Sequence, residues 1–96
     1  MAAYFVVDVK VTDPQLYEEY RKQVGATLQT YGGKFIVRGG QVEVIEGEWP
    51  VQRLVILEFE DTEQFKRWYH SPEYTKIRAI RFQASEGRAL LVQGIE

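Results

Sequence analysis

Apolar residues recur along the chain with two different periods. Four segments, residues 4–11, 34–38, 52–59 and 88–95, are rich in β-branched and aromatic residues, which is typical of strands. Residues 14–31 and 61–84 place their large apolar side chains three or four positions apart, which is the spacing of a helix face. The order strand, helix, strand, strand, helix, strand predicts an α+β, ferredoxin-like βαββαβ fold with a four-stranded antiparallel sheet.

Capping residues give the expected ends of the helices. Asp13 followed by Pro14 begins the first helix, and Gly32-Gly33 ends it. Asp61 begins the second, and Ser71-Pro72 divides it into two pieces because serine caps a new helix and proline fits its first turn. We also expect Glu86-Gly87 to end the last helix.

The segment after the second strand is less regular. Gly39-Gly40 bends the chain, and residues 42–45 are interpreted as a kinked or hairpin extension of that strand. Gly47-Glu48-Trp49-Pro50 then forms a loop. The third strand is continuously apolar at its centre, so we expect it to be buried on both faces.

Both faces of the predicted sheet are partly apolar. Residues of a strand point alternately to opposite faces, so Phe5 and Val7 lie on one side while Tyr4 and Val6 lie on the other. The helices of this topology cover one face only. We therefore expect a second copy to cover the other face, giving a homodimer, although a mildly apolar monomer surface is the alternative.

Length, charge and composition exclude several classes. Ninety-six residues predict one domain over 1–96. A net charge of −2, with both signs interspersed, gives no basic surface for nucleic acid or for an acidic membrane, and no apolar run is long enough to span a bilayer. With no cysteine and a strand-like start in place of a signal peptide, a cytoplasmic location is expected.

Several motifs together resemble the family known as domain of unknown function 1330. They are Gly32 to Gly40, Glu46 to Trp49, Arg53 at the start of a strand, the run Trp68-Tyr69-His70-Ser71-Pro72-Glu73-Tyr74, and Arg81. The resemblance covers nearly the whole chain. It implies a dimeric α/β barrel, a fold shared with small cofactor-free monooxygenases, muconolactone-isomerase-like enzymes and stress-responsive proteins, and it implies no particular reaction.

Two arginines are the main candidates for binding a ligand. Arg38 ends one strand and Arg53 begins another, so either guanidinium can reach a cavity beside the sheet. A buried arginine needs a carboxylate. Either an acidic ligand or a protein side chain would supply it, the candidates being Asp8, Glu43, Glu46 and Glu58. Asp8 stands on an otherwise apolar strand and is a candidate base or counter-ion.

The aromatic box supplies the remaining candidates. Trp68 and Tyr74 are interpreted either as ligand contacts, together with Arg81, or as core residues. Tyr69 and the only histidine, His70, are candidate proton donors or acceptors beside Asp8. Ser71 is interpreted as a helix cap. One histidine, no cysteine and no phosphate loop predict no metal and no nucleotide cofactor.

Three functions remain open from the sequence. The first is a pocket in the dimer that binds a small acidic or carbonyl-bearing molecule, either as a cofactor-free isomerase or as a monooxygenase-like enzyme. The second is a non-catalytic ligand-binding or stress-related dimer. The third is purely structural, and it predicts a cavity too small or too dry for a ligand.

Overall fold

A computed structural model describes residues 1–95 of the protein. Its elements follow one another along the chain as β1 Ala3–Val11, α1 Pro14–Tyr31, β2 Lys34–Arg38, β3 Leu54–Phe59, α2 Thr62–Tyr69, α3 Pro72–Ala84 and β4 Ser85–Gln93. The strands form one antiparallel sheet in the order β2-β3-β1-β4. The predicted α+β ferredoxin-like fold is confirmed.

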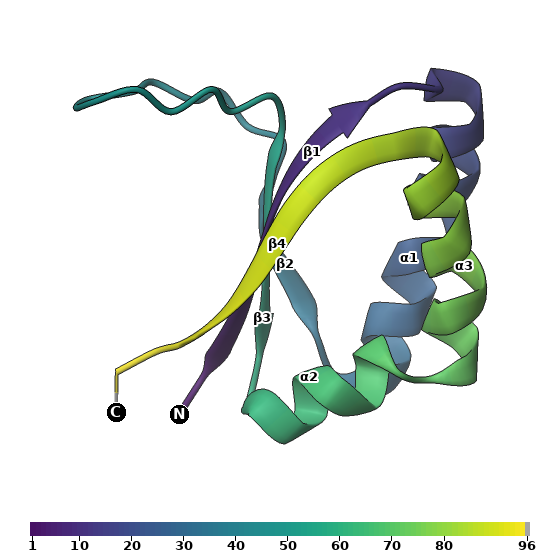
Figure 1. Ribbon diagram of the computed structural model, residues 1–96. Helices are drawn as coiled ribbons and strands as arrows, with labels where there is room; N and C mark the ends of the chain where they lie inside the picture. Colours follow the sequence, from purple (N-terminus) through teal and green to yellow (C-terminus); the bar gives the residue numbers. More distant parts are fainter. Residues whose placement is uncertain (96) are drawn as a thin grey trace.

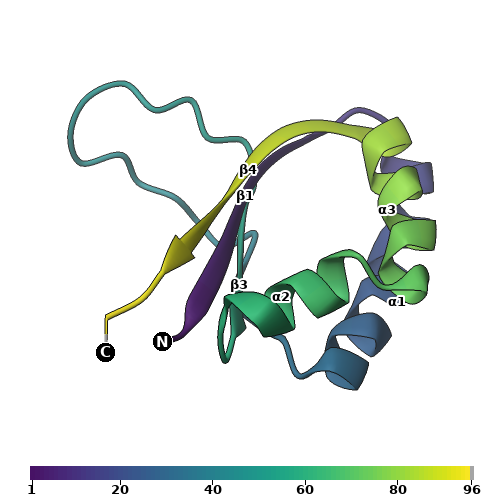
Figure 2. The same cartoon turned by 60° about the horizontal axis from the view of Figure 1, so that its bottom comes forward.

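All three helices lie on one side of a strongly curved sheet (Figure 1). Turning the molecule shows β1 and β4 bending over towards the ends of α1 and α3 (Figure 2). The core fills the space between these layers, and its largest fully buried side chains are Trp68, Tyr74, Phe59 and Leu28. No helix within residues 1–95 is long and apolar enough to cross a membrane.

The predicted helix caps are present. Asp13 accepts a hydrogen bond from the Leu16 amide, and Asp61 accepts one from the Gln64 amide, at 3.1 and 2.7 Å. Ser71 caps α3 by accepting from the Tyr74 amide at 3.1 Å, while its hydroxyl donates to the Trp68 carbonyl at 2.7 Å. The helical segment is therefore divided at Ser71, as expected.

Two sequence-based expectations about local structure are wrong. Residues 42–45 form no strand; residues 40–52 instead make an extended arm that projects from the end of the sheet, away from the helices (Figure 1). Glu86-Gly87 does not end α3, because the chain passes directly from Ala84 into β4 at Ser85. Gly87 lies within β4, where a Cβ would approach the Asp8 carbonyl oxygen to 2.7 Å.

The face of the sheet opposite the helices is apolar and uncovered in the single chain. Leu90 and Val92 of β4, which are 56% and 46% exposed, lie there opposite Val6 and Tyr4 of β1. Ile56 pairs with Val6 on the same face. The expected two-sided sheet is thus present, with helices on one side only.

Candidate functional site

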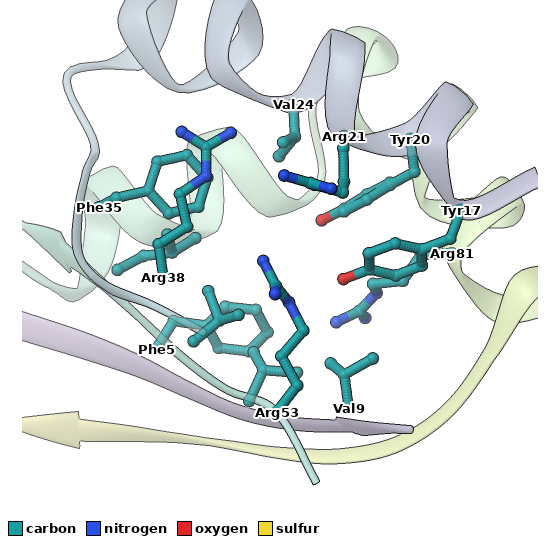
Figure 3. A pocket seen from close by; sticks show the side chains of 13 residues that line it. Phe5, Val9, Tyr17, Tyr20, Arg21, Val24, Phe35, Arg38, Arg53 and Arg81 are labelled. Atoms are coloured by element: carbon teal, nitrogen blue, oxygen red, sulfur yellow. The ribbon is translucent and has the colours of Figure 1, made fainter. Parts of the chain in front are cut away.

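The sheet, α1 and α3 enclose a cavity on the helix side. Its walls are mostly apolar, and four arginines enter it (Figure 3). The lining residues are Phe5, Val7, Val9, Tyr17, Tyr20, Arg21, Val24, Phe35, Arg38, Arg53, Val55, Leu57 and Arg81. We call this space the inner cavity. Its free volume is about 30 Å³, which is room for about two water molecules.

A β-bulge in β2 places Arg38 in the inner cavity. Phe35 pairs with Leu57 of β3, but Val37 pairs with Ile56, so Ile36 is an additional residue between them. Without the bulge, Arg38 would lie on the outer face, because it is three positions from the inward-facing Phe35 and side chains alternate between faces. With the bulge, Arg38 pairs with Val55 on the inner face, and its guanidinium lies 4.2 Å from the centre of the Phe35 ring.

Arg53 reaches the cavity from the residue before β3. Its side chain extends from the sheet into the middle of the cavity (Figure 3). Gly39 provides space for the guanidinium: it has a φ of +71°, and a Cβ there would overlap the Arg53 Nη1 atom. The Gly39 amide also donates to the Leu54 carbonyl at 2.8 Å, which fixes the glycine beside this strand.

Arg81 is the deepest of the four arginines. It comes from the last turn of α3 and is only 8% exposed. Its Nε has no hydrogen-bond partner in the described part of the chain, and neither has the Nε of Arg53. A buried polar atom without a protein partner is uncommon in folded proteins and requires an explanation, for which an ordered water, an ion or a ligand each suffices.

Two tyrosine hydroxyls lie side by side behind Arg81. The hydroxyl oxygens of Tyr20, which lines the cavity, and of Tyr74 are 2.8 Å apart. Burial is the main cause that raises the pKa of both side chains, while the positive charge of Arg81 acts in the opposite direction. Both phenols therefore stay protonated near neutral pH and carry no negative charge for the arginines.

Trp68 and Tyr74 stand behind the wall of the inner cavity. Both are 0% exposed, and their ring centres are 3.9 Å apart. The Trp68 indole donates to the Thr27 hydroxyl at 3.0 Å. Neither residue lines the cavity: Tyr74 contacts it through Tyr20, and Trp68 packs against Phe5 of the lining at 6.1 Å between ring centres.

Asp8 lies on the outer face of the sheet, away from Arg38 and Arg53. It pairs with Arg88 of β4 at 3.5 Å and accepts a hydrogen bond from the Gln52 amide at 3.2 Å. Glu58, another carboxylate considered for the arginines, pairs with Lys34 at 3.0 Å. The structure thus does not bring Asp8 together with the arginines of the inner cavity.

Tyr69 and His70 are also separate from the inner cavity. His70 is the exposed C-cap of α2. Tyr69 packs beneath Arg78, whose guanidinium is 4.4 Å from the ring centre, and it lines a second hollow on the other side of Arg81. This α3 hollow, defined by Tyr69, Arg81, Phe82, Ser85 and Arg88, has a free volume of about 190 Å³.

Sequence reasoning missed Tyr17, Tyr20 and Arg21 as site residues. The positions of Tyr17, Tyr20 and Val24 gave the helical period of α1 and so predicted core residues only. The hydroxyls of Tyr17 and Tyr20 could have indicated a site, because a tyrosine at a core position requires a polar partner. Within residues 1–95, no group of three or more metal-binding side chains lies close enough to hold a metal ion.

The fold and cavity define a class: small ferredoxin-like α+β proteins with a basic cavity between sheet and helices. The chain belongs to the family described as "Domain of unknown function (DUF1330)", whose sequence profile matches residues 2–95. This establishes the resemblance seen in the sequence motifs. Comparison with functionally curated proteins gives no match.

Solved structures share this fold at low sequence identity. RPA0582 from Rhodopseudomonas palustris, a protein of unknown function, has a TM-score of 0.78 at 16% identity over 99% of this chain and 83% of its own. SnoaB from Streptomyces nogalater, a cofactor-independent oxygenase, has a TM-score of 0.70 at 17% identity over 99% and 94%. A Bacteroides fragilis protein of unknown function, described as dimeric and ferredoxin-like, has a TM-score of 0.64 at 13% identity over 97% and 96%.

Proposed function

We propose that the protein binds a small acidic molecule in the inner cavity. The observation that carries this proposal is Arg81, a buried guanidinium whose Nε lacks a hydrogen-bond partner and which faces a cavity lined by three further arginines. Removing a charged group from water costs on the order of several kcal/mol unless an opposite charge compensates it. A bound carboxylate would supply that charge in a bidentate geometry that guanidinium groups match.

The free volume of about 30 Å³ is too small for an organic acid, so binding requires side chains at the cavity to move. Arg53 is half-buried and Arg38 is exposed, and each stands on a flexible stem of three methylene groups. Rotation of these two side chains widens the cavity without moving the backbone. The purely structural interpretation expects such a small space, but it leaves the unpartnered arginines without a role.

The chemistry available in the cavity suits an enzyme that stabilises a substrate anion. Preorganised guanidinium groups stabilise negative charge that develops on a carbonyl or carboxyl oxygen, as in an enolate. The neutral Tyr20 hydroxyl can donate a hydrogen bond to the same oxygen. A cofactor-free isomerisation, or an oxygenation of the kind that the name of SnoaB describes for that protein, would use such a site.

A non-catalytic ligand-binding or stress-related protein is the second candidate. It is favoured by the lining itself, which includes no carboxylate and no imidazole to act as a general base. A catalytic reaction would therefore need the substrate, water or a phenolate to accept the proton. The sequence-based grouping of Asp8, Tyr69 and His70 as catalytic residues remains untested, and these side chains lie outside this cavity.

A homodimer is the second part of the proposal. The outer face carries exposed Leu90 and Val92, and the arm adds exposed Ile45 and Trp49. Burying each such side chain against a second copy would contribute about 1.5–3 kcal/mol. The dimeric state described for the Bacteroides fragilis relative supports this arrangement. The cytoplasmic location remains a prediction from the sequence.

Ligand capture and turnover can be measured on the purified protein. Native mass spectrometry of protein isolated at low salt, compared with Arg53→Gln and Arg81→Gln, tests for a small acidic molecule that copurifies with the wild type alone. Arg67→Gln removes the same charge from the exposed surface of α2 and is the matched control. Equal occupancy in all four proteins would reject the inner cavity as the binding site, and incubation of the captured molecule with fresh protein distinguishes turnover from binding.

Light scattering tests the assembly. We expect wild type to have twice the mass of the 11.2 kDa chain, and Leu90→Glu to shift it towards one chain by placing a charge in the apolar face. Gln83→Glu adds the same charge on the exposed surface of α3 and should leave the mass unchanged. A wild type with the mass of one chain at working concentration would reject the dimer.

A further inference from the structure

The inner cavity contains more positive charge than a single carboxylate can compensate. Arg21 is paired with Glu18 at 3.1 Å. The ion pairs found within residues 1–95 include none of the other three arginines, Arg38, Arg53 and Arg81. The lining contains no carboxylate, and burial keeps the Tyr20 phenol uncharged. Three guanidinium groups, of which Arg38 is also exposed to solvent, therefore face one small space with no protein carboxylate paired to them.

These charges are not gathered at one point. Figure 3 shows Arg38 beside Phe35 at one end of the cavity and Arg81 beside Tyr17 at the other, with the Arg53 guanidinium between them. The two ends arise from different elements, because Arg38 comes from β2 and Arg81 from the last turn of α3.

Apolar side chains occupy the walls between the two ends. Val7 and Phe5 from β1, with Val55 and Leu57 from β3, form the floor, and Val24 of α1 faces them. Apart from the hydroxyls of Tyr17 and Tyr20 and the guanidinium groups, the lining offers only hydrocarbon to a ligand. The lining thus carries positive charge at both ends of the cavity and at Arg53 between them, while most of the remaining wall is apolar.

We propose that the ligand is a small dianion with a hydrocarbon body, of which a dicarboxylate is the simplest form. One carboxylate lies between Arg81 and Arg53, and the other lies at Arg38. This inference rests on the proposed function, since it names the class of acid that the inner cavity binds. A monoanion would compensate only one of the three guanidinium charges, whereas a dianion would compensate two.

The same lining should bind a dicarboxylate more tightly than an inorganic anion. Phosphate and sulfate can carry two negative charges, but they have no apolar surface to place against the valine and phenylalanine side chains. A dicarboxylate gains from both features, because burial of its methylene groups adds to the charge-assisted hydrogen bonds. Its affinity should therefore exceed that of an inorganic dianion.

Titration calorimetry on the wild-type protein tests the inference without any variant. The probes are succinate, glutarate, adipate and phthalate, each compared with the monoanion of matched size: butyrate, valerate, hexanoate and benzoate. Inorganic phosphate and sulfate are measured beside them. We expect the best diacid to bind about ten-fold or more tightly than its monoacid, the ratio that one additional charge-assisted hydrogen-bonded pair gives.

Variants then assign each carboxylate to its end of the cavity. Arg38→Gln should reduce the ratio of diacid to monoacid affinity to near one, while the monoacid itself binds within about three-fold of its wild-type affinity. Arg81→Gln should weaken both acids. Arg67→Gln, on the exposed surface of α2, should change neither.

The possible outcomes distinguish a failure of this inference from a failure of the proposed function. Equal affinity of diacids and monoacids in the wild type would overturn the dianion and leave an acid-binding cavity. Tighter binding of phosphate or sulfate than of every diacid would overturn the hydrocarbon body. If no organic or inorganic anion binds at millimolar concentration, both the dianion and the proposed function are rejected.

Discussion

The hydroxyl oxygens of Tyr20 and Tyr74 lie 2.8 Å apart, one at the cavity wall and the other fully buried. This contact joins α1 to α3 across the core, over 54 positions of the sequence. It also links the aromatic box, through Tyr74, to the cavity that the box does not itself line. Each hydroxyl provides the other with its polar partner.

The first prediction concerns this pair. Tyr20→Phe removes the partner of a hydroxyl with no exposure, so it should lower the free energy of unfolding by about 1–3 kcal/mol. Tyr74→Phe should cost less, because the Tyr20 hydroxyl can turn to water in the cavity. The double variant should be more stable than the sum of the single effects predicts, because no orphaned hydroxyl remains. Urea unfolding of the four proteins measures this, and strict additivity would contradict it.

The second prediction concerns the stability cost of Arg81. Arg81→Met keeps a long apolar stem and removes the buried charge, so in buffer without multivalent anions it should raise the free energy of unfolding by about 1–4 kcal/mol. The same variant should lose the thermal stabilisation that an anionic ligand gives to the wild type. A loss of stability on this replacement would show that the guanidinium already has a favourable partner.

The third prediction separates backbone strain from displacement of Arg53. Gly39 and Gly47 have φ values of +71° and +72°, but only a Cβ at Gly39 would meet Arg53. Alanine at either should lower stability by about 1–3 kcal/mol through the left-handed backbone. Only Gly39→Ala should also weaken anion binding.

Gly40→Ala is the control for that comparison. Gly40 is not among the glycines with positive φ, and a Cβ there meets nothing within 4 Å. It should leave both stability and binding unchanged. Equal weakening of anion binding by alanine at residues 39 and 47 would exclude a specific role for the space beside Arg53. Unfolding curves and calorimetry on the three variants give both quantities.

The fourth prediction concerns pH and the outer face. The hydrogen bond from Lys34 is the main cause that lowers the pKa of Glu58 below its ordinary 4.5. The folded protein therefore binds this proton less readily than the unfolded chain. The resulting stability is fully present above about pH 4.5 and is lost as the pH falls through the lowered value of the folded state.

Glu58→Gln tests that sign. The variant should lose stability relative to wild type above pH 5, and the difference should shrink towards pH 3, because a protonated Glu58 resembles the amide. Glu63→Gln, at the start of α2 and outside the ion pairs found within residues 1–95, is the control. A difference that grows on acidification would contradict the direction of the pKa shift.

Most of the fold followed from local rules, because its signals are short-range. Asp13, Asp61 and Ser71 cap helices by hydrogen bonds to amides three residues away, so the sequence alone predicts them. Within the arm, only residues 42–45 were wrongly expected to extend a strand, because apolar residues such as Val42 and Val44 predict an extended segment but no partner. A strand requires a second strand to receive its hydrogen bonds, and pairing is a long-range property.

The site was predicted in part for the same reason. Arg38, Arg53 and Arg81 were recognised as candidates from their positions at element ends and in the family motifs, and the structure brings them to one cavity. Asp8 was expected with them. Side chains alternate between the two faces along β1, however, and Asp8 lies on the outer face, where Arg88 pairs with it. The bulge at Ile36, which decides the face of Arg38, arises from pairing between β2 and β3 and has no local signature.

Ile36, the additional residue of the bulge, makes the cavity independent of the arm that follows it in the chain. It sets the direction of Arg38 before the chain enters the arm, and β3 fixes Arg53 after the chain leaves it. We therefore expect changes of length or sequence in the arm to leave the directions of both guanidinium groups unchanged. We therefore expect the segment proposed to meet another copy to tolerate changes that leave the chemistry of the cavity intact.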